Sequence, residues 1–179
     1  LRLLSRLLGS LEIRLEFPLV HEEVQQDEFL AYATERRIVI RPADFNPERI
    51  ILSGLCTGGG RFALRRAVEY AKERRVFNNT PIGAHQGVQH PLAMARSEIE
   101  LASLMALKAA WHFDNGLPAG EFANMAKYTA AEAGIHAVDA AIQTHGGNGF
   151  TKEYGIYDLY GLVRLLRTAP LNREMVLNH

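Results

Sequence analysis

The chain has 179 residues, of which 47% are hydrophobic and 22% charged, values typical of one soluble globular domain. Its 20 Lys and Arg residues balance its 20 Asp and Glu residues, so no basic field favours nucleic acid or an anionic membrane surface as a partner. The single cysteine, Cys56, excludes an intrachain disulfide and is more typical of a buried packing residue. No apolar run is long enough to span a bilayer, and in the absence of a targeting signal we expect a cytoplasmic location.

The N-terminal part of the sequence has no clear structural pattern. The chain begins at Leu1 and has its first methionine at Met94, so we expect it to be part of a longer protein. Residues 1–45 favour a helix up to Leu15 and one short strand over residues 37–41. We expect residues 46–179 to form a separate helical domain.

The first long helix of this domain is expected to begin at Asn46. Asparagine is a favoured N-cap residue, Pro47 suits the first helical position, and Glu48 complements the positive end of the helix dipole. Apolar residues then recur with a helical period until about Phe77. Glycines at residues 58–60 each cost roughly 1 kcal/mol inside a helix, so they indicate close helix packing, a ligand or a bend.

Three further helices follow, separated by short connections. The second is expected over about residues 86–115 and the third over about residues 119–144, which are rich in alanine and end at glycines. The fourth covers residues 157–168, and Pro170 breaks it before residues 171–178. Four long helices with short connections predict an all-α fold, an antiparallel four-helix bundle.

Two segments place an Arg or Gln donor beside a turn. The first contains Glu73-Arg74-Arg75-Val76-Phe77 and Pro81-Ile82-Gly83-Ala84-His85-Gln86, and the second runs from Gln143 to Phe150. Glycines in the second segment let the backbone approach a ligand closely, as a large phosphate-bearing cofactor requires. Taken alone, Arg74 is explained more simply as a cation that complements the helix dipole. The glycines also suit a helix C-cap with a turn, which is compatible with a binding role.

Together with Asn46-Pro47-Glu48-Arg49, Tyr70-Ala71-Lys72-Glu73-Arg74 and Met125-Ala126-Lys127, these motifs resemble the C-terminal helical domain of acyl-CoA dehydrogenases. Their order and approximate spacing match over about residues 44–160. The resemblance implies FAD-dependent insertion of a double bond between the α and β carbons of an acyl-CoA thioester, in which a carboxylate removes the α proton while hydride leaves for the flavin. It also implies a homo-oligomer, dimer or tetramer, and electron-transfer flavoprotein as the electron acceptor.

The resemblance also assigns cofactor-binding residues. Arg74 matches the arginine that contacts the FAD pyrophosphate from a neighbouring subunit, with Phe77 packing nearby. Gln86 matches a glutamine associated with the adenosine part of FAD, and Gln143, Gly146 and Gly147 match the loop that receives it. The predicted cofactor-binding residues are therefore Arg74, Phe77, Gln86, Gln143, Gly146 and Gly147.

The catalytic base of this family stands in one of two places. Glu48, at the head of the first bundle helix, matches one of them in type and spacing and is the favoured base. The stretch that corresponds to the other place, residues 169–172, contains no acid, so Glu174 is the second candidate. Without the resemblance, a glutamate in the first helical turn is commonly only a dipole partner, and a base there requires burial in an apolar acyl pocket.

Three departures from the family pattern keep other hypotheses open. One extra residue stands between Phe77 and Pro81, Gly161-Leu162 replaces an Arg-Asp pair, and residues 1–45 are too short for the two domains that precede this bundle in the family. The alternatives are a non-catalytic helical oligomerisation module, and an acyl-CoA oxidase or nitroalkane-type flavin oxidase of the same fold. We expect no metal site, because no histidine pair has zinc-binding spacing.

Overall fold

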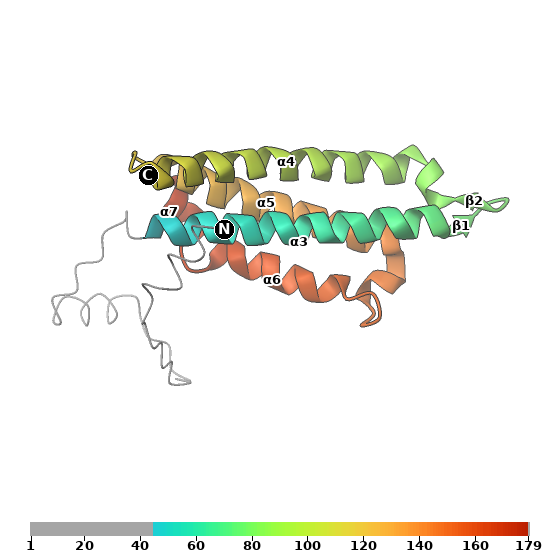
Figure 1. Ribbon diagram of the computed structural model, residues 1–179. Coiled ribbons are helices and arrows are strands. Elements are labelled where there is room, and N and C mark those ends of the chain that lie inside the picture. The colour runs from blue at the N-terminus through green and yellow to red at the C-terminus, as the bar shows by residue number, and fades with distance from the viewer. Residues whose placement is uncertain (1–44, 179) are drawn as a thin grey trace, which may run out of the picture. The chain divides into compact units, whose positions relative to one another are not determined.

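The computed structural model describes residues 45–178, which belong to the second of the two units into which the chain divides. Four long helices run alternately in opposite directions, and they are α3 (Asn46–Glu73), α4 (Gln86–Asp114), α5 (Gly120–His145) and α6 (Ile156–Thr168) (Figure 1). This confirms the predicted all-α bundle. The helix expected before Leu15 and the strand expected over residues 37–41 lie outside the described residues.

Helix α5 is the centre of the bundle. It packs against α3, α4 and α6, while α4 and α6 lie on opposite sides of the α3–α5 pair (Figure 1). The buried side of α5 is mainly alanine, so the neighbouring backbones approach closely. Gly134 is an example, because a Cβ there would lie 3.2 Å from the carbonyl oxygen of Cys56 on α3.

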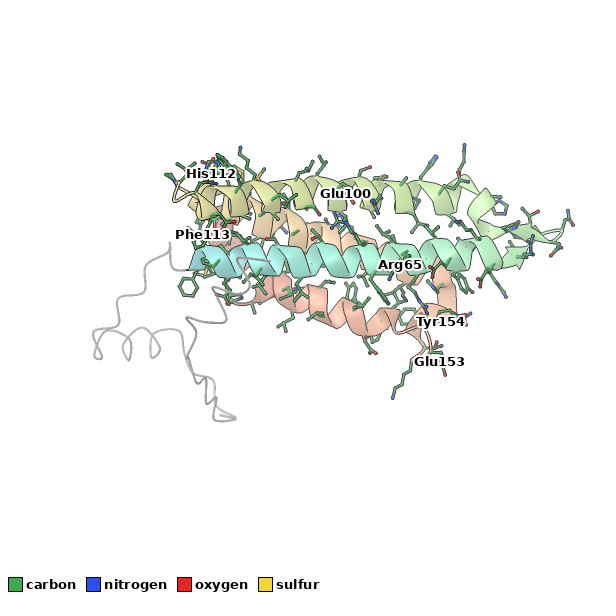
Figure 2. The ribbon with its side chains drawn as sticks, viewed as in Figure 1. Arg65, Glu100, His112, Phe113, Glu153 and Tyr154 are labelled. Carbon is green, nitrogen blue, oxygen red and sulfur yellow. The ribbon has the colours of Figure 1, made fainter. Side chains whose placement is uncertain are left out.

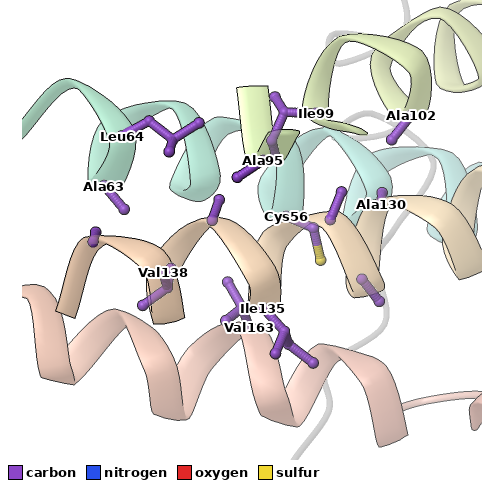
Figure 3. Close-up of a cluster of buried hydrophobic side chains, with 14 of the residues drawn as sticks. Cys56, Ala63, Leu64, Ala95, Ile99, Ala102, Ala130, Ile135, Val138 and Val163 are labelled. Carbon is purple, nitrogen blue, oxygen red and sulfur yellow. The ribbon is translucent and has the colours of Figure 1, made fainter. Parts of the chain in front are cut away.

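The core is built from small and β-branched side chains on all four helices (Figure 3). Cys56, Ile99, Val138 and Val163 are almost completely buried and come from four different helices. Burial raises the pKa of the Cys56 thiol to about 11, against the opposing effect of the Lys127 charge. Cys56 is therefore the packing residue that the sequence predicted.

The start of α3 differs by one residue from the prediction. The helix includes Asn46, and Phe45 occupies the N-cap position without a side-chain cap. The Asn46 side chain instead accepts a hydrogen bond of 3.1 Å from the Arg49 guanidinium within the first turn. Asn46 is buried, so its amide serves this internal contact and not the capping of a free backbone N–H.

Helix α3 continues unbroken through its three glycines. A Cβ at Gly60 would lie 2.4 Å from the end of Ile99 and 3.2 Å from Ala137, which confirms close packing at this position. At Gly58 nothing lies within 4 Å of the same point, so packing does not explain that glycine.

Helix α3 ends at Glu73, four residues before the predicted end, because a small hairpin begins there. Strands β1 (Arg75–Val76) and β2 (Thr80–Pro81) pair antiparallel, with Arg75 opposite Pro81 and Val76 opposite Thr80. The three connecting residues, Phe77, Asn78 and Asn79, have φ values of 37°, 57° and 64°. Asparagine tolerates this left-handed region, whereas it strains Phe77. The extra residue noted in the sequence therefore lies in a left-handed turn.

A short helix, η3 (Gly146–Phe150), folds the chain back over the end of α5. Gly146 has φ 59° and ψ −136°, a conformation that is essentially restricted to glycine, so α5 stops where the sequence predicts. A Cβ at Gly149 would lie 2.8 Å from the Ile142 carbonyl oxygen. Two glycines are thus required by the geometry of this turn.

Two further short helices complete the described chain. One, η2 (Ile82–Ala84), follows the hairpin, and α7 (Arg173–Leu177) follows α6. The Glu132 carboxylate on α5 joins α6 and α7 by ion pairs of 2.9 Å to Arg167 and 3.6 Å to Arg173.

Among residues 45–178 there is no helix with the length and apolar character needed to cross a membrane.

Candidate functional site

The predicted site residues lie at the two ends of α3. Glu48 is in its first turn, and Arg74 immediately follows its last residue. At the rise of an α-helix these two positions are about 39 Å apart along the axis. The hairpin, the start of α4 and the end of α5 are at the Arg74 end (Figure 1), so the predicted cofactor-binding residues all lie at that end.

A cavity of about 330 Å³ opens at the Arg74 end of the bundle. It brings together three of the predicted residues, Arg74, Gly146 and Gly147. The described residues that line it are Tyr70, Arg74, Ile82, Thr144, His145, Gly146, Gly147 and Asn148. The cavity therefore combines a cation, several polar side chains and glycine backbone.

Arg74 is held by its backbone and leaves its side chain for other contacts. Its N–H donates to the Tyr70 carbonyl at 2.8 Å, and its own carbonyl accepts from the Ile82 N–H at 2.8 Å. The side chain is exposed, and no ion pair or side-chain hydrogen bond joins its guanidinium to another residue within 45–178. A guanidinium of this kind, beside backbone without Cβ atoms, suits a phosphate group.

Three aromatic rings support the wall of the cavity. His145 is only 3% exposed, stacks on Tyr70 with ring centroids 4.4 Å apart, and meets Tyr154 edge-on at 5.1 Å. Its Nδ1 donates to the Ala141 carbonyl at 2.7 Å, while its buried Nε2 has no hydrogen-bond partner among the described residues. Tyr154 lies at the opposite end of the bundle from His112 and Phe113 (Figure 2).

The remaining predicted cofactor residues lie at the same end of the bundle but do not line the cavity. Phe77 is 81% exposed in the hairpin turn and faces the His85 ring at 6.2 Å. Gln86 begins α4 and Gln143 lies in the last turn of α5, both exposed. These three residues therefore lie on the surface at the cavity end of the bundle.

Sequence reasoning gave no role to Tyr70 or Asn148, although both line the cavity and contact each other. The Asn148 amide donates a hydrogen bond of 3.1 Å to the Tyr70 hydroxyl. Tyr70 lies four residues before Arg74, and residues at that spacing share one face of a helix. This spacing is the signal that would have identified Tyr70.

Glu48 occupies a different environment at the other end of α3. Its side chain is half-buried and makes no hydrogen bond or ion pair with the other described residues. Glu48 acts on Lys127, a buried lysine that donates a hydrogen bond to the Leu166 carbonyl. Burial lowers the pKa of Lys127, while the Cys56 and Glu48 charges raise it. Glu174, the second candidate base, is exposed in the first turn of α7.

Among the described residues, no group of three or more His, Cys, Asp or Glu side chains is placed to hold a metal ion.

The protein belongs to the class of up-and-down helical bundles, and it has a cavity at one end whose residues suit a phosphate group. Residues 38–175 match the family described as acyl-CoA dehydrogenase, C-terminal domain. The chain therefore belongs to the acyl-CoA dehydrogenase family.

Individual relatives agree with this assignment. The acyl-CoA dehydrogenase FadE12 of Mycobacterium tuberculosis is 57% identical over 138 residues, which are 76% of this chain and 35% of that protein. Butyryl-CoA dehydrogenase of Megasphaera elsdenii matches with a TM-score of 0.74 and 27% identity over 76% of this chain and 36% of its own. A structure described as PigA with FAD and proline matches with a TM-score of 0.72 and 27% identity, over 75% of this chain and 35% of its own. The chain thus spans about a third of each relative's length.

Proposed function

We propose that this chain is the C-terminal domain of an enzyme that oxidises an acyl-CoA thioester between its α and β carbons with FAD. The observation that carries the proposal is the Arg74 side chain, which has no ion pair or side-chain hydrogen bond among residues 45–178 and lines a cavity together with Gly146 and Gly147. Family membership supports the reaction class. FAD, when bound, supplies the acceptor for the hydride that leaves the β carbon.

The residues of the cavity suit the pyrophosphate region of FAD. Arg74 would pair with a phosphate, because a guanidinium binds two phosphate oxygens with its planar fork of N–H donors. A Cβ added at Gly146 or Gly147 would meet no atom of the described residues within 4 Å, so the backbone there is open to an approaching ligand. Phe77, Gln86 and Gln143 are exposed at the same end. Phe77 would pack near the pyrophosphate, and Gln86 and Gln143 would contact the adenosine side.

Glu48 is the proposed base that takes the α proton. A general base must be free to accept a proton, and Glu48 has no hydrogen-bond donor among the described residues. Its side chain is half-buried, so it is partly open to an approaching substrate. Glu174 is exposed and would need another part of the protein to enclose it.

The distance between the two ends of α3 supports an assembly in which subunits share sites. The α and β carbons react next to the flavin ring, so the base of a site must lie close to that ring. A base and a phosphate-binding arginine about 39 Å apart on a single helix therefore serve more easily in two different sites. Arg74 would then contact the FAD of an adjacent subunit. We propose electron-transfer flavoprotein as the protein that reoxidises the flavin.

The test uses the full-length gene product that contains this sequence. Flavin absorbance reports whether the protein binds FAD, and bleaching of that absorbance with a panel of acyl-CoAs reports the half-reaction. Glu48→Gln is expected to retain FAD and lose bleaching. Glu121→Gln is the matched control, because Glu121 is a carboxylate in the first turn of α5 at the same end of the bundle and is exposed.

Each outcome assigns the function differently. Loss of bleaching in Glu48→Gln but not in Glu121→Gln supports both the reaction and the base. Retained bleaching in Glu48→Gln removes Glu48 as the base, and Glu174→Gln is then the next variant. A wild-type protein that takes up no flavin contradicts the enzyme proposal and leaves an oligomerisation module.

A further inference from the structure

We propose that Tyr70 is an additional cofactor-binding residue, whose hydroxyl donates a hydrogen bond to an anionic oxygen of the nucleotide bound in the cavity. This inference rests on the proposed function, because it concerns the same cavity and the same ligand class, a nucleoside diphosphate. The Tyr70 hydroxyl would add one O–H donor to the N–H donors of the Arg74 guanidinium.

The position of Tyr70 places it beside Arg74. The two residues are four positions apart, with Tyr70 in the last turn of α3 and Arg74 at its C-cap. Both line the cavity of about 330 Å³. A phosphate that pairs with the guanidinium would therefore lie next to the phenol.

The hydrogen bonds of Tyr70 leave its proton available. Its hydroxyl oxygen accepts from the Asn148 amide at 3.1 Å. A phenol has one O–H donor in addition to its lone pairs, and no acceptor for the Tyr70 proton occurs among residues 45–178. The hydroxyl is thus oriented on one side by Asn148 and has its donor free.

The ring of Tyr70 is fixed before any ligand binds. It stacks on the buried His145 ring at 4.4 Å and meets Tyr154 edge-on at 5.6 Å. His145 is itself anchored by its hydrogen bond to the Ala141 carbonyl. A donor held in place in this way loses little conformational entropy on binding, which favours a direct contact with the ligand.

The decisive variant is Tyr70→Phe in the full-length gene product. It removes the hydroxyl and keeps the stacked ring, so the bundle is expected to fold normally. FAD binding to the apoprotein is measured by the quenching of flavin fluorescence. The dissociation constant for FAD is expected to rise about tenfold, the usual loss when a hydrogen bond to a charged group is removed. Helix content by circular dichroism is expected to match the wild type.

Tyr154→Phe is the matched control. Tyr154 belongs to the same aromatic cluster but does not line the cavity, so its variant is expected to bind FAD as the wild type does. Asn148→Ala tests the orientation of the hydroxyl. It is expected to weaken FAD binding in the wild-type background and to have a smaller effect when Tyr70→Phe is already present.

The outcomes separate this inference from the proposed function. If the wild type binds FAD and Tyr70→Phe binds it equally tightly, the inference is wrong and the proposed function stands. If Tyr154→Phe weakens binding as much as Tyr70→Phe, losing either hydroxyl of the aromatic cluster has the same effect, a direct contact from Tyr70 does not explain the loss, and the inference is again wrong. If the wild type binds no FAD, the proposed function fails and Tyr70 loses its role with it.

Discussion

Glu48 and Arg74 stand at opposite ends of one continuous helix, about 39 Å apart along its axis. Glu48 is half-buried, while the Arg74 side chain is exposed beside a cavity. A rigid helix fixes this separation, because the α3 backbone has no break at its three glycines. The bundle therefore has two distinct ends, one at Glu48 and one at the cavity.

The Arg74 end predicts a specific loss of cofactor affinity. Arg74→Ala is expected to weaken FAD binding by about 1.5–3 kcal/mol, because a hydrogen-bonded pair between the guanidinium and a phosphate is lost. Equilibrium titration of the apoprotein with FAD measures this. Lys72→Ala removes the same charge from the last turn of α3 outside the cavity and is expected to have little effect. Equal losses in both variants would mean that only general charge matters.

The turn after α5 predicts a stability effect. Gly149→Ala would place a Cβ 2.8 Å from the Ile142 carbonyl oxygen, so the turn must shift, and the free energy of unfolding is expected to fall by about 1–3 kcal/mol. Urea unfolding measures it. Gly161→Ala is the control, because nothing lies within 4 Å at that position of α6 and alanine favours a helix by about 0.5–1 kcal/mol. A Gly149→Ala protein as stable as the wild type would contradict the close approach.

The buried thiol predicts a pH dependence. Burial raises the pKa of Cys56 from 9.0 to about 11, so the unfolded chain loses this proton before the folded one does. The stabilisation is complete below pH 9 and is lost as the pH rises to about 11, a change of roughly 2–3 kcal/mol. Denaturant unfolding at pH 8, 10 and 11 measures the slope.

Cys56→Ala separates this effect from the titration of other groups. The variant is expected to be less stable than the wild type at pH 8, since it removes a buried side chain, and the difference is expected to shrink as the pH rises. A difference in the free energy of unfolding that is constant from pH 8 to pH 11 would show that the thiol does not titrate in this way.

The bundle was predictable from the sequence because its signals are local and periodic. Pro47 marks the first turn of α3, and Gly146 marks the end of α5, where its backbone conformation requires glycine. The hairpin after α3 was not predicted, because two-residue strands have no periodicity and the left-handed turn at Phe77 has an unusual residue.

The cavity was predicted only in part. Arg74, Gly146 and Gly147 follow from motifs, and the structure brings them together. The contact between Tyr70 and Asn148 joins residues 78 positions apart, which no local pattern reports. Long-range packing of α3 against the end of α5 creates this part of the site.

The central claim is that the two ends of one bundle, at Glu48 and at Arg74, serve different active sites. Subunit complementation tests this claim. Glu48→Gln, expected to be inactive, and Arg74→Ala, expected to be inactive at limiting FAD because it binds the cofactor weakly, are dissociated, mixed and reassembled as variants of the full-length gene product. If Arg74 serves the neighbouring subunit, each mixed pair contains one site with both residues intact, and activity is expected to return. If both residues serve the same chain's site, every site in the mixture keeps one defect, and an inactive mixed assembly would contradict the account.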